Sequence, residues 1–315
     1  MKKIIFSIAS TLLVTAVAVA QIDASESNLS TLNQDGTTNT GKVDQIGFAN
    51  ASLINQDGGR NNGTVYQDGI DFHYAEIVQE GQKNTAVIKQ FENYNTAFVD
   101  QYGDLNDSFV VQSREENSST QVQEGNSNMA KVYQNKLMIG ETDRALEVSG
   151  GFNVVTQTQI GNANRSVALQ GVGLFGLVGH NNIASMTQEG NSNLQVSIQD
   201  GEYNTLVQSQ MGDSNESTVA QTAAADNYAS STIVGHHNVT FINQQLGESS
   251  SFATIVQDGD FNKSRIFQKS GDDNTAIFEQ LGDYNISNIL QTGNTQVSNV
   301  TQTGSGNSSL GSQAN

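Results

Sequence analysis

The sequence contains no cysteine, no proline and no tryptophan, and it has few basic residues. Without cysteine, the chain can form neither a disulfide framework nor a thiolate metal site. Proline removes a donor from a β-ladder, so its absence from a chain with 30 glycines indicates uninterrupted backbone ladders. Only 14 lysines and arginines stand against 32 aspartates and glutamates, a net charge of -18. This balance argues against a nucleic-acid partner, because phosphate binding needs clustered basic side chains.

The N-terminus has the features of a secretory signal peptide. Lys2 and Lys3 precede the apolar run Ile4–Val19, and small residues before Gln21 form a cleavage site. We predict a signal peptide at 1–20, a short tail at 21–27 and a repeat region at 28–315. A single transmembrane anchor is the alternative, but the run is short and polar residues follow it. No second apolar run appears, so we expect an exported protein with no transmembrane segment.

An eleven-residue pattern runs through nearly all of the repeat region. Asn, a small residue, an apolar residue and Gln occupy alternate positions, often followed by Gly two residues after the Gln. We count about two dozen copies, far more than a repeat architecture needs. The residues that we predict to line the interior as a ladder include Asn84, Ala86, Ile88, Gln90, Asn95, Ala97, Val99, Gln101, Asn274, Ala276, Gln280, Asn285, Ser287, Ile289 and Gln291.

The alternation predicts strands, with the patterned residues on one face and a mixed set opposite. Glycine permits the tight arc that follows each strand. Two strands and two arcs close a coil of about 22 residues, and stacked coils form an all-β, two-sheet parallel β-solenoid. Stacking would place Asn above Asn and Gln above Gln, so that each side-chain amide donates to the next copy. The predicted arc glycines are Gly36, Gly58, Gly81, Gly103, Gly125, Gly190, Gly201, Gly259 and Gly282.

The pattern is irregular in a few places. His73 takes an Asn position and Ile233 takes a Gln position. Residues 135–152 contain at best a degenerate copy, and residues 171–181 lengthen one arc. We interpret both stretches as bulged arcs between retained strands. The number of strands matters, because an odd number would require successive subunits to stack with a half-turn rotation.

Other chemistry is weakly supported. Aspartates recur beside arc glycines, and a calcium ladder is one interpretation, since hard cations take carboxylate oxygens. We favour solvated arcs whose like charges slow premature assembly. His236 and His237 beside an arc carboxylate are a weaker candidate for a metal site. No Ser, His and Asp combination indicates catalysis, so we expect neither enzymatic activity nor a cofactor. The aspartates are Asp35, Asp57, Asp68, Asp200 and Asp258.

The unit resembles the curlin repeat of curli fibre subunits, in which Gly-x-x-Asn-x-Ala-x3-Gln forms the second half. Gly81, Asn84, Ala86 and Gln90 match that half in full. The chain differs from the family pattern in using Asn for Ser, in carrying more copies and in being strongly acidic. The resemblance implies an extracellular amyloid fibre of a Gram-negative-type bacterium, serving biofilm and adhesion. It also implies a dedicated outer-membrane secretion pore and a nucleator as partners, and it leaves open whether this chain is a major or a nucleating subunit.

The first and last copies follow the motif closely and show no atypical capping repeat. Exposed strand edges template further strands, so we expect head-to-tail stacking into a homopolymer that is cross-β amyloid. A soluble or surface-attached monomeric adhesin is the competing interpretation. A disordered chain is a third, which the strict alternation opposes. The predicted polymerisation edges are Asn28, Ser30 and Gln34 at one end, and Asn307, Ser309 and Gln313 at the other.

Overall fold

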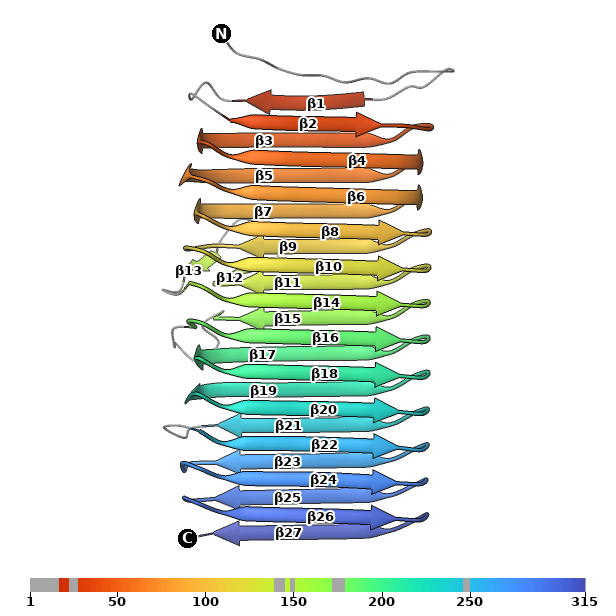
Figure 1. Cartoon of the computed structure of the whole chain (residues 1–315), viewed down its shortest axis with the longest axis vertical. Coiled ribbons are helices and arrows are strands. Elements are labelled where there is room, and N and C mark those ends of the chain that lie inside the picture. The colour runs from red at the N-terminus through yellow and green to blue at the C-terminus, as the bar shows by residue number, and fades with distance from the viewer. Residues whose placement is uncertain are drawn as a thin grey trace.

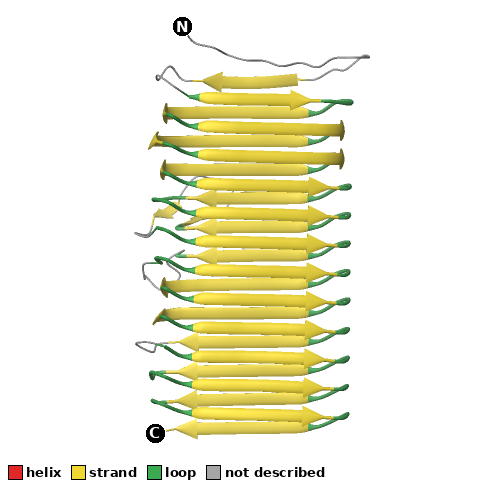
Figure 2. Ribbon diagram, viewed as in Figure 1, coloured by secondary structure: helices red, strands yellow, loops and turns green. Residues whose placement is uncertain are grey.

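The structure is a computed structural model that describes residues 17–22, 28–138, 145–147, 151–171, 179–245 and 250–314. Every regular element in these ranges is a β-strand (Figure 2). The described part of the chain contains no helix that could cross a membrane.

The strands form two large parallel sheets that stack into one long column (Figure 1). We call them the odd sheet and the even sheet, after their strand numbers. The odd sheet has 13 strands, in the order β1 (Val17–Ile22), β3 (Thr40–Phe48), β5 (Asn62–Asp71), β7 (Thr85–Asn93), β9 (Asp107–Gln112), β11 (Met129–Gln134), β15 (Arg165–Gln170), β17 (Leu194–Glu202), β19 (Glu216–Ala225), β21 (Val239–Gln245), β23 (Lys263–Lys269), β25 (Ile286–Thr292) and β27 (Ser308–Ala314). The even sheet has 12 strands, in the order β2 (Leu29–Gln34), β4 (Ala51–Gly59), β6 (Tyr74–Gln82), β8 (Thr96–Tyr102), β10 (Ser118–Glu124), β14 (Val154–Ile160), β16 (Ile183–Glu189), β18 (Thr205–Met211), β20 (Tyr228–Val234), β22 (Phe252–Asp258), β24 (Thr275–Leu281) and β26 (Val297–Thr303).

The chain alternates between the two sheets, so each strand pairs with the strand one coil away. Most coils span 22 to 24 residues, as the separations of equivalent glutamines show. The β1 end and the β27 end lie at opposite ends of the column (Figure 1). The predicted two-sheet parallel β-solenoid is confirmed.

Alternating polarity explains why these segments form strands. In β7, Ala86, Ile88 and Gln90 are buried between the sheets, while Thr85 and Val87 face outward and are only partly buried. The pairing of β7 with β9 places Ala86 beside Ser108 and Ile88 beside Val110, so like residues stack in columns. Burying each large apolar side chain contributes about 1.5–3 kcal/mol, and the column repeats this gain in almost every coil.

Residues 136–150 form an insertion between β11 and β14. Within it, β12 (Lys136–Met138) and β13 (Ala145–Glu147) pair as an antiparallel hairpin outside both large sheets. Both sheets remain continuous, since β10 pairs with β14 and β11 pairs with β15. The prediction that the surrounding strands are retained is confirmed. Among the described residues of 135–152, none adds a strand to either large sheet, which agrees with the interpretation of a bulged arc.

The strand count bears on how subunits could stack. If β1 is left out, the odd sheet and the even sheet have 12 strands each. The total number of strands from β2 to β27 in the two large sheets is therefore even. Residues 172–178, within the second bulged arc, lie outside the described residues. β1 overlaps the predicted signal peptide and pairs in parallel with β3.

Candidate functional site

A continuous ladder of glutamine side chains runs along the odd sheet from β3 to β27. Each Nε2 donates to Oε1 of the glutamine in the next coil, as from Gln67 to Gln90 at 2.9 Å and from Gln90 to Gln112 at 2.9 Å. The ladder begins at Gln45 and ends at Gln313, which accepts from Gln291 at 3.0 Å. Every bond has the same direction, with the donor in the N-terminal coil and the acceptor in the C-terminal coil.

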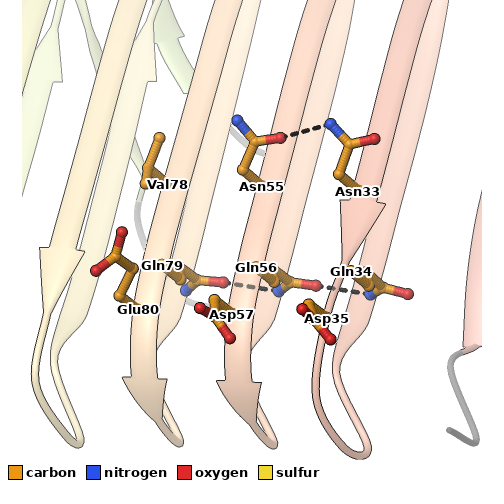
Figure 3. Close-up of a pocket in the computed structure, with 9 residues that line it drawn as sticks. All are labelled: Asn33, Gln34, Asp35, Asn55, Gln56, Asp57, Val78, Gln79 and Glu80. Carbon is orange, nitrogen blue, oxygen red and sulfur yellow. Dashed lines mark hydrogen bonds between the residues drawn. The ribbon is translucent and has the colours of Figure 1, made fainter. Parts of the chain in front are cut away.

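The even sheet has an equivalent ladder that starts at Gln34. Gln34 donates to Gln56 at 2.6 Å, and Gln56 donates to Gln79 at 2.7 Å (Figure 3). These glutamines also line a pocket, together with residues that include Asp57 and Glu80 (Figure 3).

The even ladder is interrupted once, at Ile233. Ile233 is buried in the glutamine position and has no amide to donate. As a result, the buried Oε1 of Gln257 in the next coil has no hydrogen-bond partner. An apolar residue in a ladder therefore leaves an unpaired carbonyl on its C-terminal side.

The glutamines also make a second bond, which the sequence did not reveal. Nε2 of Gln90 donates to the backbone oxygen of Tyr74 at 2.9 Å, and that of Gln101 donates to the backbone oxygen of Thr85 at 3.0 Å. These bonds cross from one sheet to the other. Both hydrogens of each amide are thus used, which offsets the cost of burying a polar group.

The asparagines follow the predicted ladder only in part. Nδ2 of Asn84 donates to backbone oxygens of its own arc and the next, at Glu80 (3.2 Å) and Gly103 (2.7 Å), while its Oδ1 accepts the backbone N–H of Asn106 at 2.9 Å. Most Asn side chains therefore hydrogen-bond to backbone oxygens of the arcs. They are shorter than Gln and lie just before a strand, beside the arc carbonyls. The predicted bond between asparagine side chains is absent at Asn84, but bonds of that kind do join neighbouring coils elsewhere, with Nδ2 donating to the preceding coil from Asn117, Asn182, Asn238 and Asn307.

His73 replaces asparagine in this role. Its backbone N–H donates to Oδ1 of Asn50 at 3.1 Å, and its Nδ1 accepts the backbone N–H of Asn95 at 3.3 Å. The side chain is 1% exposed, and burial lowers the pKa of His73 from 6.5 to about 4. The neutral imidazole thus supplies the acceptor that asparagine supplies elsewhere.

The arc glycines are required for two reasons. Gly81 has a φ of +114°, and a Cβ there would lie 2.1 Å from the backbone oxygen of Gly103 in the next coil. Interior glycines down to Gly282 meet the next glycine in the same way. Gly304 has a φ of +101°, but a Cβ on it would meet no backbone atom within 4 Å. It is the last glycine of this row within the described residues.

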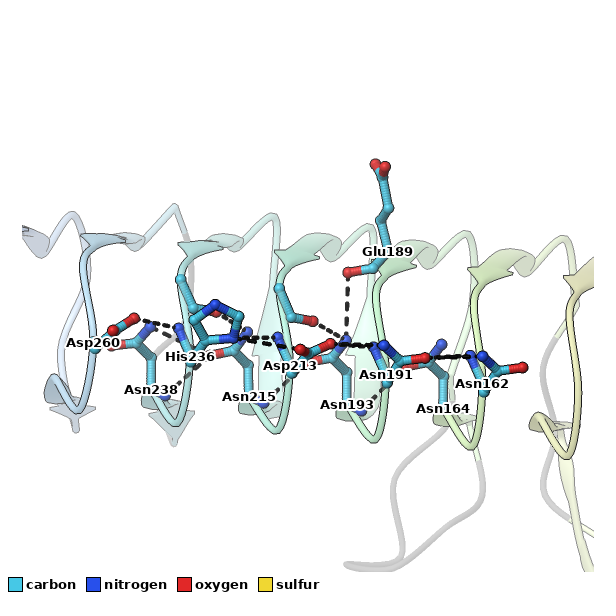
Figure 4. Close-up of polar contacts among 12 residues, drawn as sticks. Asn162, Asn164, Glu189, Asn191, Asn193, Asp213, Asn215, His236, Asn238 and Asp260 are labelled. Atoms are coloured by element: carbon cyan, nitrogen blue, oxygen red, sulfur yellow. Dashed lines mark hydrogen bonds and ion pairs between the residues drawn. The ribbon is translucent and has the colours of Figure 1, made fainter.

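A ladder of a different kind runs along the arcs, formed by the residue that follows each arc glycine (Figure 4). The side chain at this position accepts the backbone N–H of its counterpart one coil earlier. Asp213 accepts from Asn191 at 2.8 Å, His236 Nδ1 accepts from Asp213 at 3.1 Å, and Asp260 accepts from His236 at 2.8 Å. The hydrogen bond from the Asn191 backbone lowers the pKa of Asp213. Recurrent Gly-Asp and Gly-Asn pairs were the sequence signal for this ladder.

The arc carboxylates and histidines do not converge on a cation site in the part of the chain that the structure describes. There, no group of three His, Asp or Glu side chains could hold a metal ion. Nδ1 of His236 lies 3.6 Å from Oδ2 of Asp213, as a single pair. Asp35 instead uses Oδ1 to accept the backbone N–H of Gly36 at 2.8 Å.

Aromatic side chains stack between neighbouring coils. Tyr74 and Phe98 lie on the outer face of the even sheet with ring centroids 5.5 Å apart. Phe261 and Tyr284 stack on the arcs at 5.0 Å. Three further pairs of aromatic rings lie on the odd sheet, namely Tyr66 with Phe91, Tyr133 with Phe109, and Phe241 with Phe267. Each pair joins residues of two successive coils.

The interior and edge residues occupy different environments. The fifteen residues expected in the ladder are all buried, with at most 1% exposure. The six expected at the polymerisation edges are only partly buried. In the two large sheets, the described strands β1, β2, β26 and β27 are each paired on one side only, whereas β3 is paired with both β1 and β5.

A family model for the curlin associated repeat matches residues 74–103 and 249–282, which contain β6 to β8 and β22 to β24. No curated protein matches the chain.

Proposed function

We propose that this chain, which carries curlin associated repeats at residues 74–103 and 249–282, is a structural subunit that assembles head-to-tail into extracellular amyloid fibres. The fibres would form a biofilm matrix and attach cells to surfaces. The chain would be secreted by its signal peptide and would pass an outer-membrane pore before a nucleator starts assembly. This role requires no catalytic site and no cofactor.

One observation supports polymerisation most directly. At the one-sided strands β2, β26 and β27, the interior pattern continues to the edge, with Gln34, Gln302 and Gln313 still in the ladder positions. An unpaired strand edge offers its backbone groups to another chain. A repeat of coils that ends in an ordinary coil can be extended by another copy of itself.

Assembly of purified protein tests this proposal. Residues 21–315, the form left by the predicted cleavage, would be diluted from denaturant and followed by thioflavin fluorescence and electron microscopy. We expect unbranched filaments, and a trace of sheared filaments should remove the lag. A stable monomer with β-type circular dichroism would contradict the proposal and favour the monomeric adhesin.

A matched pair of variants tests whether the C-terminal edge is the growing surface. Lysine at both Ser309 and Gln313 places charges in interior columns, so we expect seeded growth to slow by about tenfold or more. Lysine at both Leu310 and Ser312 adds the same charge on the exposed outer face of β27 and serves as the control. Equal growth of the two variants would contradict a role for this edge.

A further inference from the structure

The glutamine ladders give the column a chemical direction. Because each Nε2 donates toward the C-terminal coil, the first glutamine of a ladder lacks a donor to its Oε1. The last glutamine lacks a ladder acceptor for its Nε2. A column built this way has acceptors at its N-terminal end and donors at its C-terminal end.

The acceptor end carries a buried, unpaired oxygen. Gln45 is fully buried, and its Oε1 has no hydrogen-bond partner. The residue that pairs with Gln45 is Ile22 of β1, which has no side-chain donor. The situation matches the interior break, where Ile233 leaves Oε1 of Gln257 unpaired. β1 therefore covers the edge of β3 without completing its ladder.

The donor end carries amides that make only one of their two usual bonds. Nε2 of Gln313 donates to the backbone oxygen of Val297 at 2.9 Å, and Nε2 of Gln302 donates to that of Ile286 at 3.3 Å. Interior glutamines make this bond and the ladder bond together. One N–H on each terminal amide is thus available to a further coil.

We propose that a second copy of this chain joins the two ends in one defined register, with β27 of one copy pairing with β3 of the next, in the place that β1 occupies before the signal peptide is cleaved. Gln313 then donates to Gln45 and Gln302 donates to Gln34, so both ladders pass across the junction. β26 pairs with β2, which sets Gly304 beside Gly36. This inference rests on the proposed polymer and specifies its contact surface.

The register follows from the fold. Each sheet contributes 12 strands from β2 to β27, so the next coil after β26 and β27 begins in the even sheet, where β2 lies. Successive subunits stack in the same orientation, with no half-turn. The contact joins two different surfaces, and such a contact continues without closing and gives a filament. Head-to-head contact would place acceptor against acceptor, and tail-to-tail contact donor against donor.

Gly304 gives a specific test. In interior arcs, a Cβ on the equivalent glycine meets the next glycine's carbonyl oxygen at 1.9–2.5 Å. At Gly304 that space is open within one subunit, and in the proposed junction the carbonyl of Gly36 from the next copy fills it. Gly306 is a matched control in the same arc, since its φ is also positive (+73°) and a Cβ there meets nothing within 4 Å.

The experiment compares Gly304→Ala with Gly306→Ala in residues 21–315, by elongation from wild-type seeds. A Gly304→Ala subunit can add once to the donor end of a filament and then prevents further addition there. We expect about a tenfold or larger loss of elongation rate, and inhibition of wild-type growth by a small admixture. Gly306→Ala should grow like wild type. If Gly304→Ala grows equally fast, the register is wrong although the polymer stands; if wild-type protein forms no filaments, the proposed function itself fails.

A second pair of variants guards against a folding defect of Gly304→Ala. Gln313→Glu removes the donor and places a carboxylate against Oε1 of Gln45, whereas Ser312→Glu adds the same charge on the exposed face. We expect Gln313→Glu to slow elongation about tenfold or more, and Ser312→Glu to leave it unchanged. Keeping residues 1–20 should also slow elongation, because β1 then occupies β3. Normal growth of both Gln313→Glu and the uncleaved chain would overturn the inference.

Discussion

An interior glutamine such as Gln90 donates two hydrogen bonds and accepts one, and these bonds stabilise different parts of the column. The bond between coils joins neighbouring strands of one sheet, and the bond to a backbone oxygen joins the two sheets. Loss of one side chain therefore leaves polar groups unpaired in three places. A buried group that loses its partner costs about 1–3 kcal/mol, more than the net gain from a typical hydrogen bond.

Gln90→Met should destabilise the fold by about 3 kcal/mol, because Nε2 of Gln67 and Oε1 of Gln112 both lose their hydrogen-bond partner. Methionine nearly preserves the side-chain volume. The midpoint of chemical denaturation measures this loss. Val87→Met on the outer face of the same strand is the control and should change stability by less than about 0.5 kcal/mol. Equal effects of the two substitutions would argue against the ladder as a source of stability.

His73 makes stability depend on pH. Burial lowers its pKa to about 4, while the nearby Asp68 carboxylate acts in the opposite direction and is the weaker influence. Because the folded pKa lies below 6.5, the unfolded chain binds more protons between these two values. The stabilisation is complete above about pH 6.5 and is lost as the pH falls toward 4, by up to about 3 kcal/mol.

His73→Asn should remove this part of the pH dependence, because Oδ1 of asparagine can accept from Asn95 without titrating. Denaturation midpoints at several pH values between about 4 and 7 measure the slope for both proteins. At neutral pH the variant should be at least as stable as the wild type. An unchanged slope would show that other groups dominate the acid response.

At the scale of strands and arcs, the sequence predicted those features that depend on one residue type at a fixed position. The period of two predicted the strands, and Gly81 and its equivalents predicted the arcs. The asparagine contacts were not predictable, because reach to a neighbouring carbonyl depends on backbone geometry. Likewise, nothing in the identities of Lys83 or Leu105 indicated their left-handed φ angles of 58° and 60°. The stacked arcs impose that conformation on whichever residue precedes the asparagine.

The two insertions illustrate the same limit. Residues 135–152 lack the pattern, and the sequence could not tell a degenerate strand from an excursion. The structure distinguishes a degenerate strand from an excursion. The backbone N–H of Asn153 donates to Oδ1 of Asn117, 36 residues earlier, so the two asparagines occupy equivalent positions in neighbouring coils. Register between distant residues decides the strand count, and it is a property of the assembled sheets.

Gly81→Ala should destabilise its arc by about 3 kcal/mol, from the positive φ together with the overlap with the Gly103 carbonyl. Lys83→Ala is the matched control, since that residue lies in the same arc, is exposed and already has a positive φ. Hydrogen exchange of the arc amides would locate the effect. If both substitutions were neutral, the close approach of successive arcs would be incorrect.

At the scale of the whole molecule, the strong negative charge of each subunit opposes the association that its exposed strand edges favour. The 18 excess negative charges make subunits repel one another, while every coil repeats the same inward pattern. Assembly then depends on ladders that match in register and direction. The equal number of strands in the two sheets from β2 to β27 allows such a match without rotation.

The axial repeat of the filament tests this account most directly. Twelve strands at a spacing of about 4.8 Å give a rise of about 58 Å per subunit. Electron cryomicroscopy of filaments grown from residues 21–315 should show this rise with all subunits in one orientation, and aligned fibres should give a meridional reflection near 4.8 Å. Filaments with alternating subunit orientation, or protein that stays monomeric and never shows that reflection, would contradict the account.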